Sequence, residues 1–174
     1  MACPESDIRL SPGAIDPFYG PGSDGREWFC TVWENITGAD FIDLHGYIRG
    51  PDPTLCWSKA RFEHDPLKWQ GLNYLECCWT LLDVLPNRHA GLPIVISECN
   101  HLWKTVEPDW GWVNDKRAAS VTASLYERAL EWNRHNAQQI IAVCLYRWQG
   151  DAWAIAKNDH VLSALANQVT KGEQ

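Results

Sequence analysis

The chain has 174 residues and a formal net charge of −7 at pH 7, and 45% of its residues are hydrophobic. This composition is ordinary for a globular domain and excludes a wholly disordered chain, a collagen and a coiled coil. Because an acidic chain repels a polyanion, we expect no nucleic acid among its partners. The length predicts a single domain over residues 1–174.

The sequence carries no sign of a membrane or of an oxidising compartment. No apolar run approaches the ~18 residues that span a bilayer, and the first residues, MACPESDIRL, lack the apolar stretch of a signal peptide. The seven cysteines include no C-x-x-C pair, the spacing typical of zinc sites. We therefore expect reduced thiols in a cytoplasmic protein, with no metal and no membrane partner.

The first half of the chain contains two candidate strand–helix units. Residues 7–15 (DIRLSPGAI) are an extended candidate, and apolar side chains at helical spacing predict a helix over 26–36. A second strand is predicted over 39–48 (ADFIDLHGYI), because this segment is rich in β-branched and aromatic residues. A long loop over 49–70 then leads to a helix over 72–85, which a proline ends.

The second half repeats the same alternation. Residues 93–97 (PIVIS) are apolar at every central position, which is typical of a strand covered on both faces. A long loop over 98–112 leads to the clearest helix, over 115–133, where apolar residues recur at i, i+3, i+4 and i+7. A fourth strand is predicted over 139–146 (QIIAVCLY) and a short closing helix over 160–169.

Four strand–helix units predict parallel strands with right-handed crossovers, and two α/β architectures fit them. A small doubly wound sheet would need a glycine-rich phosphate turn to bind a nucleotide. Neither G-x-G-x-x-G nor G-x-x-x-x-G-K-[ST] is present, so no cofactor is expected. A half TIM barrel is favoured, because polar residues at the ends of barrel strands converge on one mouth. Such residues end three predicted strands: His45 and Tyr47, Glu98 and Asn100, and Arg147 and Trp148.

The segments DFIDLHGY, PIVISECN and IIAVCLYRWQGDAWAI together resemble the C-terminal half of a clan A glycoside hydrolase (β/α)8 barrel. The resemblance runs from about Asp7 to the end of the chain. It implies that Glu98 stands at the position of the catalytic nucleophile. It also implies that His45 and Tyr47 end the sixth barrel strand and that Trp148 lies under the sugar.

The candidate site residues also have structural interpretations. Glu98 can be an anchored carboxylate, held by His45 or by Arg147, and Tyr47 can simply pack. We expect Arg147 to be an outward, solvated charge. Asn100 completes the candidate substrate-binding set with His45, Tyr47 and Trp148, although a residue in a loop can also serve only to shape it. The chain has eleven tryptophans, and most of them are expected to pack in the core rather than to stack on sugars.

The chain departs from the family in one respect. By the resemblance, the general acid/base of the family is a second glutamate, preceded by asparagine, which would lie upstream of Met1. Retaining glycosidases need two carboxyl groups about 5 Å apart, so Glu98 alone does not suffice. Acidic residues of the long loop can replace the missing acid; the candidates are Asp52, Glu63 and Asp65.

A half barrel also leaves two strand edges and an apolar interior open. The sequence therefore predicts a homodimer, or pairing with a separate N-terminal half barrel, unless the chain is a fragment. The function that we expect is hydrolysis or binding of O-glycosides, with a saccharide as ligand. The alternative is a catalytically inactive carbohydrate-binding or assembly module, and a third possibility is an unrelated chemistry on a reused half barrel.

Overall fold

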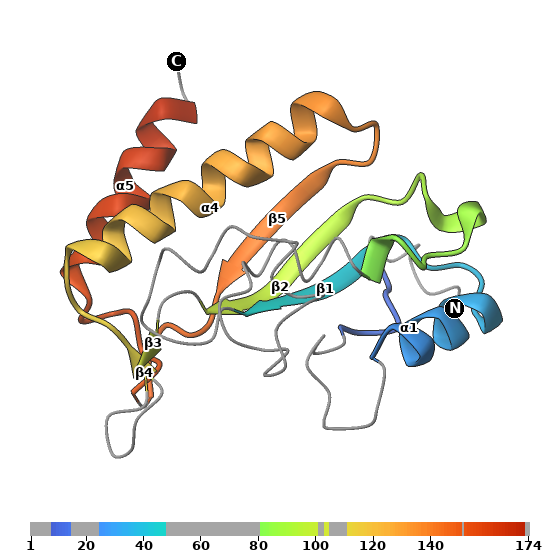
Figure 1. Cartoon of the computed structure of the whole chain (residues 1–174), viewed down its shortest axis with the longest axis horizontal. Helices are drawn as coiled ribbons and strands as arrows, with labels where there is room; N and C mark the ends of the chain where they lie inside the picture. The colour runs from blue at the N-terminus through green and yellow to red at the C-terminus, as the bar shows by residue number, and fades with distance from the viewer. Residues whose placement is uncertain are drawn as a thin grey trace, which may run out of the picture.

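The structure is a computed structural model that describes residues 8–14, 25–47, 81–100, 103–104, 111–150 and 152–172. It confirms a mixed α/β fold, built on a three-stranded sheet in the order β1-β2-β5 (Figure 1). Both strand pairs are parallel. The strands of this sheet are β1 (Ile42–Tyr47), β2 (Ile94–Asn100) and β5 (Ile140–Leu145).

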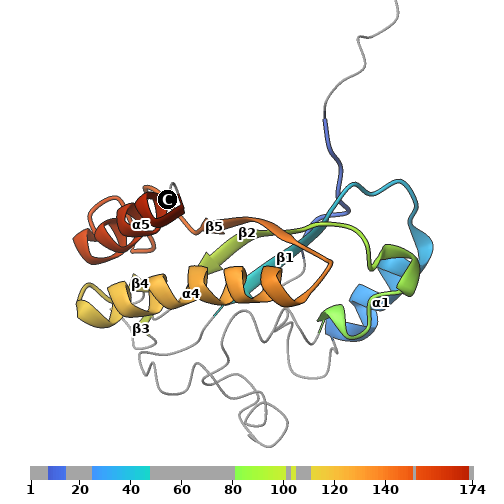
Figure 2. The same ribbon diagram turned by 90° about the horizontal axis from the view of Figure 1, so that it is seen from above.

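In both views α4 runs alongside β5, with α5 next to it, and α1 lies on the opposite side of the sheet from α5 (Figures 1 and 2). Helix α4 contacts both β5 and α5. Their bounds are Gly25–Asn35 for α1, Lys116–His135 for α4 and Asp159–Gly172 for α5, with a short 3-10 turn, η2, at Asn87–His89.

One face of the sheet forms the hydrophobic core. Ile42 and Leu44 of β1 and Ile94 and Ile96 of β2 are fully buried there. They share one buried cluster with apolar residues of the helices, which explains why the helices keep an apolar stripe. The helix residues of that cluster are Phe29 and Trp33 of α1, Ala118, Val121, Leu125 and Ala129 of α4, and Val161 of α5.

Because side chains alternate between faces along a strand, the opposite face of the sheet carries Asp43 and His45 of β1, together with Val95 of β2, which lies opposite Asp43. Asp43 and His45 alternate with the buried Ile42 and Leu44, and both are only partly buried. We call the face that bears Asp43, His45 and Glu98 the site face.

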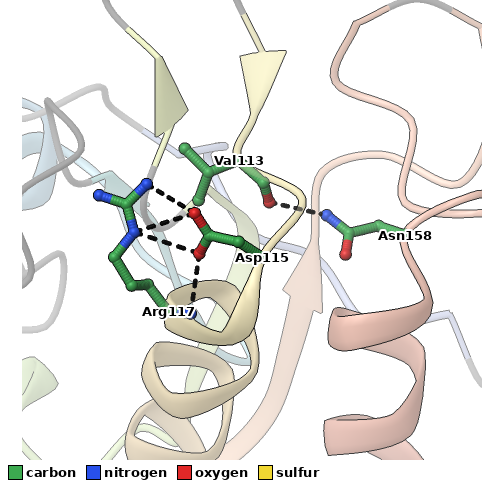
Figure 3. Close-up of polar contacts among 4 residues, drawn as sticks. All are labelled: Val113, Asp115, Arg117 and Asn158. Carbon is green, nitrogen blue, oxygen red and sulfur yellow. Dashed lines mark hydrogen bonds and ion pairs between the residues drawn. The ribbon is translucent and has the colours of Figure 1, made fainter.

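The ends of the helices are held by polar contacts. Asp115 caps α4 by accepting a hydrogen bond from the Arg117 backbone N–H at 2.8 Å (Figure 3). The Arg117 side chain also donates hydrogen bonds to both Asp115 carboxylate oxygens, and this hydrogen bonding lowers the pKa of the Asp115 carboxyl. Asn158 is buried and donates from Nδ2 to the Val113 carbonyl at 3.0 Å, while its Oδ1 accepts from the Val161 backbone N–H (Figure 3). Asn158 therefore ties the start of α5 to the segment that precedes α4.

The C-terminal end of α1 is also held by hydrogen bonds. The last carbonyls of a helix lack partners within it. Here the Trp33 carbonyl accepts a hydrogen bond from Arg88 Nη2 at 2.7 Å and lies 2.9 Å from His89 Nε2. The His89 ring also packs edge-on against the Trp33 indole, with ring centroids 5.0 Å apart. The segment before β2 thereby fixes α1 against the sheet.

The prediction of a first strand over 7–15 is wrong for residues 8–14, which form no strand. Pro12 offers no backbone N–H, and Gly13 has a φ of +96°, so this segment cannot continue a ladder. Leu10 instead exchanges two hydrogen bonds with Asp40, and its own side chain is exposed. The four expected strand–helix units are therefore reduced to three parallel strands, and the described residues form an open sheet rather than a barrel.

The loop expected over 98–112 also differs in the structure. Strand β2 continues to Asn100, so Glu98 and Asn100 belong to the strand. Two short strands, β3 (Trp103–Lys104) and β4 (Gly111–Trp112), then pair antiparallel. The predicted loop over 49–70 lies outside the described residues. The predicted helix over 72–85 is described only from Leu81; Leu81 and Leu82 are helical, and a turn begins at Asp83, so the helix ends before the predicted position. No helix in the described ranges is both long enough and apolar enough to cross a membrane.

Replacing Asp115 with alanine is expected to lower the free energy of unfolding at pH 7 by about 1 kcal/mol, the usual cost of losing an N-cap. The pKa of Asp115 is lowered in the folded chain, so its contribution is present above the unfolded-state pKa. That contribution is lost as the pH falls through the folded-state pKa. Urea unfolding at several pH values measures the difference between variant and wild type.

Asp115→Asn is the matched control, because asparagine keeps a capping oxygen and loses the charge. We expect it to retain most of the stability at pH 7. A stability difference between Asp115→Ala and wild type that stays constant from pH 7 down to about pH 2, well below the ordinary aspartate pKa, would contradict the assignment.

Candidate functional site

The carboxyl ends of β1, β2 and β5 meet at one edge of the sheet, where their arrowheads point the same way (Figure 1). In parallel α/β folds the functional side chains gather at this edge. His45 lies near the end of β1 and Glu98 near the end of β2. Tyr146 follows β5 directly. Three strands thus bring polar side chains to a common edge.

His45 and Glu98 form the best-defined contact of this edge. They are register partners across the β1–β2 pair, and His45 Nε2 lies 3.7 Å from Glu98 Oε2. Their side chains are 24% and 26% exposed, so solvent or a ligand can reach both. The distance allows an ion pair when the imidazole is protonated. The imidazole of His45 can therefore hold the Glu98 carboxylate in one orientation.

Backbone and thiol contacts fix the position of the Glu98 strand relative to β5. The next residue, Cys99, is buried, and its Sγ donates to the Cys144 carbonyl at 3.3 Å. The Cys99 carbonyl in turn accepts from the Tyr146 backbone N–H at 2.9 Å. Behind these strands, burial raises the pKa of Tyr126 on α4 to about 12, with smaller Coulombic contributions from Cys99 and Cys144. Tyr126 therefore remains a neutral hydroxyl at physiological pH.

The segment after β5 is a closed loop that presents Trp148. The Arg147 backbone N–H donates to the Trp153 carbonyl at 3.1 Å, and the Arg147 carbonyl accepts from Ile155 at 2.9 Å. The Trp148 carbonyl accepts from Ala156 at 3.1 Å. The Trp148 side chain is 58% exposed. Because hydrogen bonds fix the backbone at Trp148 while its indole is exposed, the ring offers a flat apolar face that a ligand can contact.

Arg147 is not the outward, solvated charge that the sequence suggested. Its side chain is partly buried, and the guanidinium carbon lies 5.5 Å from the centroid of the Tyr146 ring. Its Nη1 donates to the Tyr146 hydroxyl at 3.3 Å. Gly150 approaches the guanidinium so closely that a Cβ there would lie 2.5 Å from Nη2. The arginine therefore packs inside the loop.

The remaining predicted residues are only partly described. Tyr47 and Asn100 are register partners that end β1 and β2, so their backbones lie at the site edge. Their side chains are outside the description. The loop acids proposed as replacement proton donors also lie outside the described residues; they are Asp52, Glu63 and Asp65.

Sequence reasoning missed Asp43. It precedes His45 by two residues on β1 and therefore shares the site face. Its Oδ1 atom is buried, and no described residue donates a hydrogen bond to that atom. Strand alternation could have placed Asp43 on the same face as His45. Nothing in the sequence, however, indicated that an oxygen of the Asp43 carboxylate would be buried.

No group of three or more histidine, cysteine, aspartate or glutamate side chains within the described ranges is arranged to hold a metal ion. Comparison of the chain with protein-family models, with curated proteins and with solved structures finds no match. The candidate site therefore rests on its own geometry.

Gly150→Ala is expected to lower the free energy of unfolding by about 1–3 kcal/mol, the usual cost of strained backbone. The residue has a φ of +133°, which disfavours a side chain, and the new methyl group would meet the Arg147 guanidinium. Urea unfolding followed by circular dichroism measures the loss.

Gly91→Ala is the matched control, because a Cβ at Gly91 meets nothing within 4 Å. We expect a change within about 0.5 kcal/mol there, as for other surface substitutions. If both variants unfold at the same urea concentration, Gly150 does not secure the packing of Arg147.

Proposed function

We propose that the protein is a glycoside-hydrolase-like half barrel that hydrolyses or binds O-glycosides, with Glu98 as its reactive carboxylate. The observation that carries the proposal is the contact between Glu98 and His45. Their side chains lie 3.7 Å apart, partly exposed, at the carboxyl edge of consecutive parallel strands. A carboxylate in this position can act on the anomeric carbon of a bound sugar, either directly or through a water molecule.

His45 and Trp148 have supporting roles in this proposal. The imidazole of His45 orients the Glu98 carboxylate or donates to a sugar hydroxyl. The exposed indole of Trp148 stacks on the apolar face of a sugar ring. Tyr47 and Asn100, whose backbones end the neighbouring strands, complete the binding edge.

The half-barrel part of the proposal is supported by the order of the strands. The parallel order β1-β2-β5 follows the order along the chain, as it does for consecutive strands of a barrel. Among the described strands, β1 and β5 are the two outer strands of this sheet. Such edges favour further pairing. We propose that a second copy of the chain, or a separate N-terminal half barrel, completes the structure.

A second candidate function is a carbohydrate-binding module without catalysis. The exposure of Trp148 on a hydrogen-bonded loop favours it, because stacking on a sugar needs no carboxylate. The two functions differ in what Glu98 does. In the module, the removal of the Glu98 charge would leave binding in place.

Glu98→Gln is expected to slow the release of dinitrophenol from 2,4-dinitrophenyl glycosides by at least ~100-fold. Such a leaving group departs without a proton donor, so the assay isolates the carboxylate that acts at the anomeric carbon. Absorbance of the released phenolate measures the rate over a panel of glucosides, galactosides, mannosides and xylosides of both anomers.

Equal rates for Glu98→Gln and wild type would reject Glu98 as the reactive carboxylate. Quenching of tryptophan fluorescence by the corresponding free sugars, without turnover and with loss of quenching in Trp148→Ala, would support the binding module instead.

Light scattering at micromolar concentration is expected to give the mass of a dimer, twice the 19.8 kDa of one chain. The physical reason is that pairing with a second copy satisfies the edge strands of both. A monomer that remains stable at this concentration contradicts the homodimer. It then directs attention to a separate N-terminal half as the partner.

A further inference from the structure

The exposed cysteine of β5, Cys144, lies on the site face of the sheet. Its neighbours Val143 and Leu145 pack against the hydrophobic core, whereas Cys144 is exposed. Because side chains alternate between faces along a strand, the Cys144 thiol leaves the sheet on the face opposite the core. Cys99 on the adjacent strand is buried, and its thiol donates to the Cys144 carbonyl at 3.3 Å. The two cysteines are therefore neighbours that differ in their access to solvent.

Strand β2 carries one extra residue next to the site. It runs from Ile96 to Cys99 over a span where β5 runs only from 143 to 145. On the β1 side the extra residue is Ser97, since His45 lies opposite Glu98. Such a bulge turns the side chains that follow it and is common beside active sites.

The pairing with β5 then brings Cys144 next to Glu98. Cys99 lies opposite Leu145, and Glu98 and Cys144 each come one residue before these two partners. Adjacent strands are about 4.8 Å apart, so the backbones of Glu98 and Cys144 are neighbours. His45 lies opposite Glu98 on the other side. The site face therefore carries His45, Glu98 and Cys144 in one row across three strands.

We propose that Cys144 is a modification site that regulates the sugar site: a mixed disulfide with a small peptide, such as glutathione, covers Glu98 and keeps a sugar from reaching it. This inference rests on the proposed function of Glu98 and adds a means of regulation. An extended tripeptide spans up to about 10 Å, which exceeds the spacing between two strands. A glutathione joined to the Cys144 sulfur is therefore long enough to lie over Glu98.

The modification is a thiol–disulfide exchange with oxidised glutathione as the oxidant. The Cys144 thiolate attacks one sulfur of the glutathione disulfide, and a new S–S bond forms as the old S–S bond breaks. The other half leaves as a thiolate and takes up the proton that Cys144 lost. Cys144 is thereby oxidised to the mixed disulfide while one glutathione is reduced. Excess dithiothreitol reverses the exchange.

The test treats the full chain with oxidised glutathione and identifies the modified residues by peptide mass spectrometry. We expect Cys144 to react at least ~10-fold faster than the buried Cys99, because exchange requires access to the sulfur. Release of dinitrophenol from the 2,4-dinitrophenyl glycosides should fall in proportion to the modified fraction of Cys144, and dithiothreitol should restore it.

Two variants separate Cys144 from the other cysteines. Cys144→Ser should keep its own untreated rate after treatment with oxidised glutathione. Cys30→Ser removes a thiol from α1 and is the matched control, which should lose activity on treatment as wild type does. An unmodified Cys144, or an equal loss of activity in treated Cys144→Ser and treated wild type, would overturn the inference.

A second readout does not depend on turnover. Modification of Cys144 should shift the NMR signal of the His45 ring, assigned with His45→Gln, and leave that of His89, which packs against Trp33. If the His45 signal stays in place, or if fully modified protein releases dinitrophenol at the untreated rate, this inference fails and the proposed function stands. If wild type cleaves no glycoside although the modification moves the His45 signal, the proposed function fails and the modification site beside Glu98 stands.

Discussion

The pairing between β1 and β2 shifts by one residue after Leu44, and the candidate site depends on this shift. Leu44 lies opposite Ile96, but the next residue, His45, lies opposite Glu98 rather than Ser97. Without the shift, alternation along β2 would turn Glu98 toward the same face as Ile96, into the apolar core. Burying a charged carboxylate there would be costly. The bulge instead brings Glu98 onto the site face, beside an imidazole.

The two faces of the sheet therefore have different roles: one packs against the helices, and the other carries the candidate site. Apolar side chains of β1 and β2 on one face pack with the helices, and this burial supplies the hydrophobic stabilisation of the fold. On the other face His45 and Glu98 lie near the carboxyl edge, and Asp43 lies two residues before His45, toward the start of β1. The rigid core face is what allows Asp43, His45 and Glu98 to be held in fixed relation, because each is anchored by buried neighbours in the same strand.

Polar contacts fix the ends of the helices and the loop after β5 relative to the sheet. The Trp33 carbonyl is held by residues that precede β2, and Asn158 links the start of α5 to the segment before α4. The loop after β5 is closed by its own backbone hydrogen bonds and by the packing of Arg147 against Gly150. As a result, Trp148 lies on a loop with a fixed backbone, at the same carboxyl edge of the sheet as Glu98.

Local patterns in the sequence determined the α/β class and three of the four predicted strands. They also determined the helices α1, α4 and α5. The reason is that apolar periodicity shows which face of an element is buried. The pattern failed over residues 7–15, where Pro12 and Gly13 interrupt the backbone. The sequence also identified His45, Glu98 and Trp148 as polar or aromatic residues at strand ends. Only the tertiary structure decided the register shift that joins His45 to Glu98, the enclosure of the Asp43 oxygen and the inward packing of Arg147. These depend on pairing and close packing between segments far apart in the chain, which local periodicity does not encode.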